Sequence, residues 1–138
     1  MKTLATLVIL TASFAAAQSL DYATFRAKVE PIFLKKRPTH ARCIVCHAGQ
    51  RTSFRLAEIT EGQTAFTEEQ SKQNFANIVR VINLKDPMTS PLLRHPLAGD
   101  AGGDEFHSGG RQFQSQTDPD WKTVAGLVGT LCSTFARP

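Results

Sequence analysis

Five consecutive residues, Cys43-Ile44-Val45-Cys46-His47, constrain this chain more than any other feature of its sequence. They place two thiols three positions apart and an imidazole directly after the second thiol. This is the attachment pattern of a c-type haem, in which the thiols bond the two vinyl groups of the porphyrin and the histidine lies beneath the iron. The motif predicts one covalently attached haem c, with thioethers at Cys43 and Cys46 and with His47 as the proximal iron ligand.

The cysteine count leaves other interpretations of the same pair. Three cysteines cannot all form disulfides with one another, and Cys132 stands alone near the C-terminus. Cys43 and Cys46 could form a disulfide or a zinc site with nearby histidines. Zinc would require a second close pair of ligands, and a redox-active dithiol usually lies beside a β-α-β pattern, which the sequence lacks. We expect Cys132 to be a small buried residue of the last helix.

Residues 1–17 have the features of a secretory signal peptide. Lys2 precedes an apolar run over residues 4–14, and alanines occupy positions 15–17. The run is shorter than the roughly 20 apolar residues of a transmembrane helix. We expect cleavage after position 17 and a single haem domain over residues 18–138, exported to the bacterial periplasm and without a membrane span. Export agrees with the haem motif, because the covalent attachment machinery acts on exported chains.

Hydrophobic periodicity predicts helices at both ends of this domain. The first begins at Asp21 and is kinked or ended by Pro31. The last begins at Thr117 or Asp118, has Pro119 at its first helical position and docks on the first helix. Apolar residues recur at helical spacing in both helices: Phe25, Val29, Ile32, Phe33, Trp121, Val124, Leu127, Val128 and Leu131.

A middle helix is predicted from Thr67, because Gln70 completes a capping box, and it should stop by Asp86 before Pro87. From there to Gln116 the chain is rich in Gly and Pro and has no sustained period, which is typical of a functional loop. We find no segment that alternates as a strand does. The fold class is therefore all-α, a small cytochrome c-like helical domain with long loops around one haem. The expected buried stripe of the middle helix is Phe75, Ile78, Val79 and Ile82.

Spacing alone does not assign the second axial ligand of the iron. The sequence offers Met88, His95, His107 and His40, and methionine would raise the redox potential relative to histidine. Met88 follows a proline in the loop after the middle helix, as methionine ligands commonly do in small cytochromes c, although hydrophobic packing explains it equally well. An open coordination site is the remaining alternative.

Several segments after the haem motif resemble the exported cytochromes c of the planctomycete and acidobacterial type. In that group the attachment motif is followed by a Ser-x-Leu-Leu segment, a histidine with paired glycines and a late helix that carries an aromatic residue. The resemblance spans most of the chain after position 17. The matching residues are Ser90-Pro91-Leu92-Leu93-Arg94-His95-Pro96-Leu97-Ala98, Ala101-Gly102-Gly103, His107-Ser108-Gly109-Gly110 and Asp118-Pro119-Asp120-Trp121.

The resemblance implies that His107 is the distal iron ligand, with Met88 as the second choice. Gly109 and Gly110 would then let the backbone pass close to the porphyrin, since glycine has no side chain to clash. Arg111 is a candidate partner for a haem propionate, because a guanidinium binds a carboxylate through two hydrogen bonds. Arg94 has the same chemistry. A surface position is the alternative for each arginine.

These features predict an electron carrier rather than an enzyme. Two strong axial ligands would saturate the iron, so that an electron passes without any bond being made and no catalytic side chain is needed. Two other functions stay open. One is a haem-based peroxidase or gas sensor with a displaceable distal ligand, and the other is the haem subunit of a larger oxidoreductase.

The charge of the chain bears on its partners. The formal net charge is +4, and removal of Lys2 with the signal peptide lowers it to +3. The chain has no extended basic run and a single Trp, so nucleic-acid binding is poorly supported. A mild positive charge would help to steer the protein towards an acidic redox partner, although solubility alone also requires a charge of this size. The sequence does not indicate an oligomeric state.

Overall fold

The computed structural model describes residues 21–49 and 52–135, and the predicted signal peptide lies outside these ranges. Within them there is no β-strand, and the strand-like pairings are isolated bridges of Ala48 with Leu56 and of Leu97 with Phe113. The all-α class is confirmed. The helical segments are, in order, η1 (Phe25–Val29), α2 (Glu30–Leu34), α3 (Cys43–His47), α4 (Glu68–Val79), η2 (Pro87–Thr89), α5 (Pro91–Arg94), η3 (Gly99–Ala101) and α6 (Pro119–Phe135).

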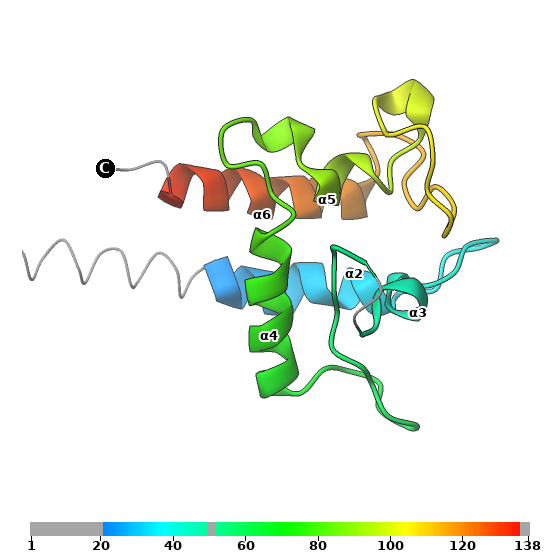
Figure 1. The fold of residues 1–138 in the computed structure, drawn as a ribbon, viewed down its shortest axis with the longest axis vertical. Coiled ribbons are helices and arrows are strands. Elements are labelled where there is room, and N and C mark those ends of the chain that lie inside the picture. Colours follow the sequence, from blue (N-terminus) through cyan, green and yellow to red (C-terminus); the bar gives the residue numbers. More distant parts are fainter. Residues whose placement is uncertain (1–20, 50–51, 136–138) are drawn as a thin grey trace, which may run out of the picture.

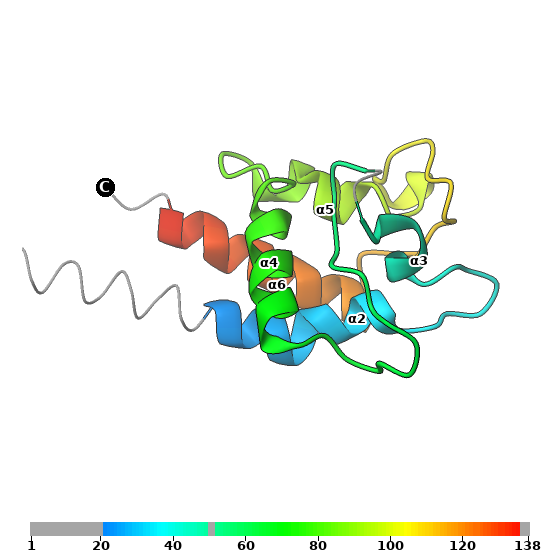
Figure 2. The same cartoon turned by 60° about the horizontal axis from the view of Figure 1, so that its bottom comes forward.

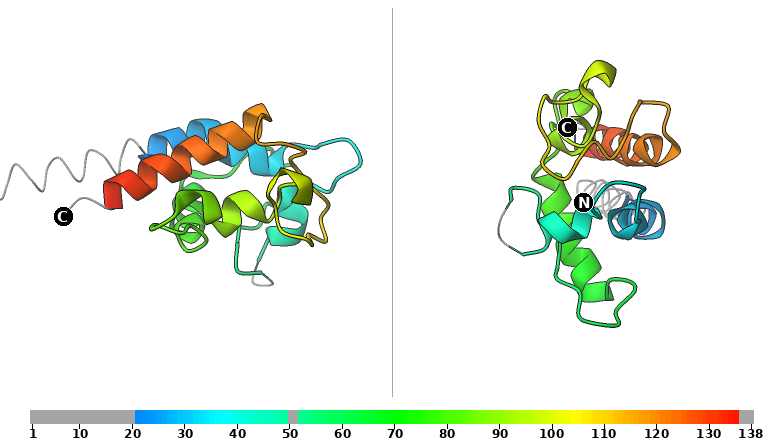
Figure 3. Two further views of the ribbon diagram at one scale, coloured as in Figure 1. Left: turned by 90° about the horizontal axis from the view of Figure 1, so that it is seen from above. Right: turned by 90° about the vertical axis from the view of Figure 1, so that its right-hand side faces the viewer.

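Two helices from opposite ends of the described chain lie side by side. α6 runs antiparallel to the continuous helix formed by η1 and α2 (Figure 1), and the end-on view shows the pair next to each other (Figure 3). The predicted docking of the last helix on the first is therefore confirmed. α4 crosses this pair (Figure 2), while α3 and the loops before α6 gather where α2 ends and α6 begins. The fully buried core side chains include Phe25, Val29, Ile78, Leu93, Val124, Leu127 and Val128.

The first helix does not end at Pro31 but continues to Leu34. The disturbance instead takes the form of the π-helical turn η1 just before the proline, where the backbone N–H of Glu30 donates to the carbonyl of Phe25. Because a proline ring clashes with the preceding helical turn, a wider turn at this point lets the helix pass through the proline. The residues before and after Pro31 therefore belong to one continuous helix.

α4 begins at the predicted capping box. The Thr67 hydroxyl accepts from the backbone N–H of Gln70 at 3.2 Å, and the Gln70 side chain accepts from the backbone N–H of Thr67 at 2.8 Å. We predict that Thr67→Ala lowers the free energy of unfolding by about 1 kcal/mol, as measured by urea denaturation. Thr67→Ser keeps the hydroxyl and should stay near the wild type, whereas equal losses in both variants would show that the cap is not the cause.

The buried face of α4 is more polar than the predicted stripe. Ser71 and Asn74 are fully buried and donate to the two carboxylate oxygens of Glu30 on α2, at 2.6 Å and 3.0 Å. Asn74 also accepts from the backbone N–H of Ala57 at 2.7 Å. Glu30 itself is only 5% exposed. Of the predicted residues, Ile78 is fully buried on α4, Phe75 and Val79 are half-buried, and Ile82 is buried beyond the end of the helix.

α6 begins as predicted, with Asp118 as its cap. One Asp118 carboxylate oxygen accepts from the backbone N–H groups of Asp120 and Trp121, at 2.8 Å and 3.2 Å. The predicted apolar stripe of this helix is buried, and the Trp121 indole N–H donates to the carbonyl of Leu93 at 3.2 Å. Cys132 is 5% exposed on α6, as expected for a structural residue.

The segment between α4 and α6 is more regular than its sequence predicts. It contains the short helical turns η2, α5 and η3, of which the first two begin at Pro87 and Pro91. A turn of three or four residues cannot show a helical period, so the absence of periodicity did not exclude it. In the part of the chain that the structure describes, no helix is long and apolar enough to cross a membrane.

Candidate haem site

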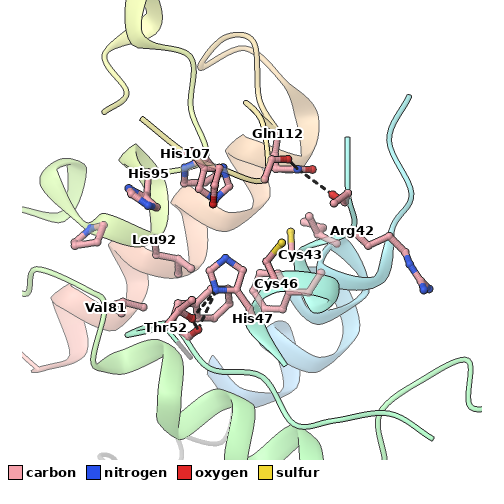
Figure 4. Close-up of a pocket in the computed structure, with 18 of the residues that line it drawn as sticks. Arg42, Cys43, Cys46, His47, Thr52, Val81, Leu92, His95, His107 and Gln112 are labelled. Atoms are coloured by element: carbon pink, nitrogen blue, oxygen red, sulfur yellow. Dashed lines mark hydrogen bonds between the residues drawn. The ribbon is translucent and has the colours of Figure 1, made fainter. Parts of the chain in front are cut away.

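A cavity of about 340 Å³ opens between α3 and the loop that precedes α6. This volume is within the roughly 300–1,000 Å³ of typical ligand pockets. Both predicted thiols, the predicted proximal histidine and the predicted distal histidine line it (Figure 4). The rest of its wall is largely apolar, from Ile32, Phe33, Phe54, Val81, Leu92, Phe113 and Val124.

The one-turn helix α3 places the attachment motif at the cavity. Residues three apart on a helix share a face, so Cys43 and Cys46 both project from the same side of α3 (Figure 4). Ile44 on the other side is 4% exposed and packs in the core. The helix is tied down at its end, where the carbonyl of His47 accepts from the backbone N–H of Leu56 at 2.8 Å.

Both thiols are free, and they differ in exposure. Cys46 is exposed, whereas Cys43 is partly buried and lines the inner wall. Burial raises the pKa of the Cys43 thiol to about 11, so this thiol keeps its proton at neutral pH. In the part of the chain that the structure describes, no group of three or more His, Cys, Asp or Glu side chains is arranged to hold a metal ion.

His47 is held with one ring nitrogen turned towards the cavity. Its Nδ1 lies 2.9 Å from the carbonyl oxygen of Phe54 and 2.9 Å from the hydroxyl of Thr52. A carbonyl can only accept, so Nδ1 carries the proton and Nε2 keeps its lone pair. Burial lowers the pKa of His47, which keeps the ring neutral. A neutral imidazole oriented by a carbonyl through Nδ1 is the usual form of a histidine that ligates a metal through Nε2.

His107 is oriented by the same device on the other side of the cavity. Its Nδ1 donates to the carbonyl of Gly110 at 2.6 Å, which leaves Nε2 with a lone pair. Burial also lowers the pKa of His107. Gly110 has a φ of +82°, and a Cβ at this position would lie 2.5 Å from Cδ2 of His40. Gly110 is therefore needed for the turn and for packing against His40, whereas Gly109 lines the cavity beside the histidine.

The separation of the His47 and His107 rings leaves room for a metal ion between them. Their ring centroids are 6.3 Å apart and their planes differ by 18°. With metal–nitrogen bonds of about 2.0 Å and a ring radius of about 1.2 Å, two imidazoles on opposite sides of one ion would have centroids roughly 6.4 Å apart. The donor set, the spacing, the apolar wall and the two thiols at the edge therefore fit a c-type haem.

Two other candidate ligands occupy different positions. Met88 lies on η2 with 49% of the residue exposed and outside the cavity wall, so the structure does not bring the alternative ligand to the site. His40 packs against Gly110, and its Nδ1 donates to the carbonyl of Pro38 at 2.7 Å. The remaining candidate, His95, lines the cavity, and its ring centroid is 4.9 Å from that of His107.

The candidate propionate partners lie beside the cavity rather than in its wall. The Arg111 guanidinium donates to the carbonyls of His95 and Leu97, at 3.4 Å each. Arg94 pairs with Asp104 at 3.6 Å. Arg42 belongs to the cavity rim, but its guanidinium points away from the thiols (Figure 4).

Sequence reasoning missed the residue that joins the two sides of the site. Gln112 is only 6% exposed, and its side-chain amide donates to the carbonyls of Ala41 and Gly109, at 3.0 Å and 3.1 Å (Figure 4). It connects the chain just before the attachment motif to the loop that carries His107. A glutamine in a Gly-rich segment gives no periodic or motif signal, so only the fold reveals this contact.

Comparison with known proteins identifies no relative. No protein-family model, no curated protein and no solved structure matches this chain. The residues of the cavity are therefore what indicates a function for this chain.

Proposed function

We propose that this chain is an exported monohaem c-type cytochrome that carries single electrons between redox partners. One observation carries the proposal, the pairing of His47 and His107 across a cavity whose edge holds Cys43 and Cys46. Each histidine offers a lone pair on Nε2, because a backbone carbonyl fixes the proton on Nδ1.

The residues would divide the work of holding one haem c. Cys43 and Cys46 would form the thioethers, His47 would be the proximal ligand and His107 the distal ligand. Haem iron supplies a one-electron couple between the ferric and ferrous states, whose potential depends on the axial ligands and on burial. The apolar wall would exclude water from the porphyrin, and the hydrogen bonds to the carbonyls of Phe54 and Gly110 hold both imidazoles in place.

This arrangement supports electron transfer better than catalysis at the iron. Both axial positions would be filled by histidines that are already oriented, so a substrate would have to displace one of them. Cys46 is exposed, which would place one edge of the porphyrin near the surface, where an electron can enter or leave. A redox protein, favoured to be acidic by the net charge, would dock there. Export to the periplasm remains a prediction from the signal sequence.

The visible absorption spectrum of the protein, produced with the haem-attachment machinery, tests the proposal. We expect sharp low-spin bands in the ferrous state, no far-red methionine-to-iron band in the ferric state, and haem that stays with the protein after denaturing extraction. High-spin iron that binds carbon monoxide readily would instead favour the peroxidase or sensor, and co-purification with a larger enzyme would favour the subunit. A colourless protein would overturn the haem proposal altogether.

A further inference from the structure

A third histidine lies next to the distal side of the cavity. His95 follows directly after α5 and lines the cavity with His107. The two ring centroids are 4.9 Å apart, and the planes meet at 73°. This is closer than the 6.3 Å between the centroids of His107 and His47. The site therefore has one imidazole on its proximal side and two on its distal side.

His95 is presented in the same tautomer as the two proposed ligands. Its Nδ1 lies 3.1 Å from a carboxylate oxygen of Asp104, which can only accept a hydrogen bond, so in the neutral ring Nδ1 carries the proton and Nε2 the lone pair. Asp104 is itself fixed, since its backbone N–H donates to the carbonyl of Arg94 at 3.1 Å and its carboxylate pairs with the Arg94 guanidinium. A carboxylate–histidine pair of this kind orients metal-ligating histidines and makes them more basic.

The two distal histidines are held by different contacts. His107 is part of a loop held by Gly110 and Gln112, whereas His95 is at the end of α5, which packs on α6. The loop also contacts His95, because Asp104 lies on it and the Arg111 guanidinium donates to the carbonyl of His95 at 3.4 Å. Withdrawal of the His107 side chain alone would therefore leave His95 in position.

We propose that His95 is a second distal iron ligand, which coordinates the haem iron when His107 is withdrawn. The inference rests on the proposed function and deepens it. With two imidazoles on the distal side, loss of one does not open the iron to peroxide, carbon monoxide or oxygen. Two distal histidines would keep the iron six-coordinate, as in an electron carrier, whereas a haem enzyme needs an open coordination position.

Four forms of the holoprotein test this inference: the wild type, His95→Ala, His107→Ala and the double variant. We expect low-spin ferrous bands in the wild type and in both single variants, because each keeps one distal histidine. The double variant should lose the low-spin bands and bind carbon monoxide. Met88→Ala, which removes an exposed side chain outside the cavity, is the matched control and should resemble the wild type.

Each deviation has a definite meaning. If the wild type lacks low-spin haem that resists extraction, the proposed function itself is overturned. If the wild type is low-spin and His107→Ala is high-spin, only the inference of a second ligand is overturned. A double variant that stays low-spin through another residue overturns the same inference. Loss of low-spin bands in His95→Ala alone would make His95 the resident ligand and also overturns it. If His107→Ala fails to mature, His107→Asn takes its place, because its side-chain amide nitrogen matches the position of Nδ1 and can still donate to the carbonyl of Gly110.

Discussion

Replacing both Cys43 and Cys46 with serine should convert a haem that survives denaturing extraction into one that is released completely. A serine hydroxyl does not form the thioether that joins the protein to the porphyrin, while His47 and His107 can bind haem only through reversible coordination. The loss of covalent haem should be total, because the structure places these two thiols together at the cavity edge. Extraction with acidified organic solvent, followed by haem staining of a denaturing gel, measures it.

Single-thiol variants and the third cysteine supply the controls. Cys43→Ser or Cys46→Ser alone should retain haem through one thioether, with the ferrous band at longer wavelength because one vinyl group stays conjugated. Cys132→Ala should keep haem fully resistant to extraction, since Cys132 is buried on α6 outside the cavity wall. Resistant haem in the double variant would show that the attachment is not at this motif.

The sequence alone identifies the residues that could hold a haem, but not which of them face each other across the cavity. The attachment motif is a local signal, and α3 displays it as predicted. The distal ligand depends on which loop folds over the cavity, and four candidates had the required chemistry. Only the tertiary structure brings His107 opposite His47, places His95 beside it and leaves Met88 on the surface.

The fold shows the same division between local and long-range signals. The capping box at Thr67 and the cap at Asp118 are short-range patterns, and both were predicted correctly. At Pro31 the sequence predicted a kink or an end, and it did not predict the π-helical turn through which the helix continues to Leu34. The polar part of the buried face of α4 was missed, since Ser71 and Asn74 are polar and their partner on α2 is distant in sequence.

That polar contact gives the largest stability effect we expect apart from the residues proposed to hold haem. Asn74→Ala should lower the free energy of unfolding of the holoprotein by about 3 kcal/mol. It leaves the backbone N–H of Ala57 without its acceptor and leaves Oε1 of the buried Glu30 carboxylate without its donor, while Ser71 still donates to Oε2. Each such loss costs about 1–3 kcal/mol. Urea denaturation at neutral pH measures the change.

Gln73 provides the matched control, because it lies on the same helix and is exposed. Gln73→Ala should stay within about 0.5 kcal/mol of the wild type. In a Glu30→Gln background the further loss from Asn74→Ala should be smaller, because the partner left behind is a neutral amide rather than a carboxylate. Equal losses in the two backgrounds would mean that Asn74 acts through Ala57 alone. Glu30 shares α2 with Ile32 and Phe33 of the cavity wall, so this contact also holds one side of the proposed haem pocket.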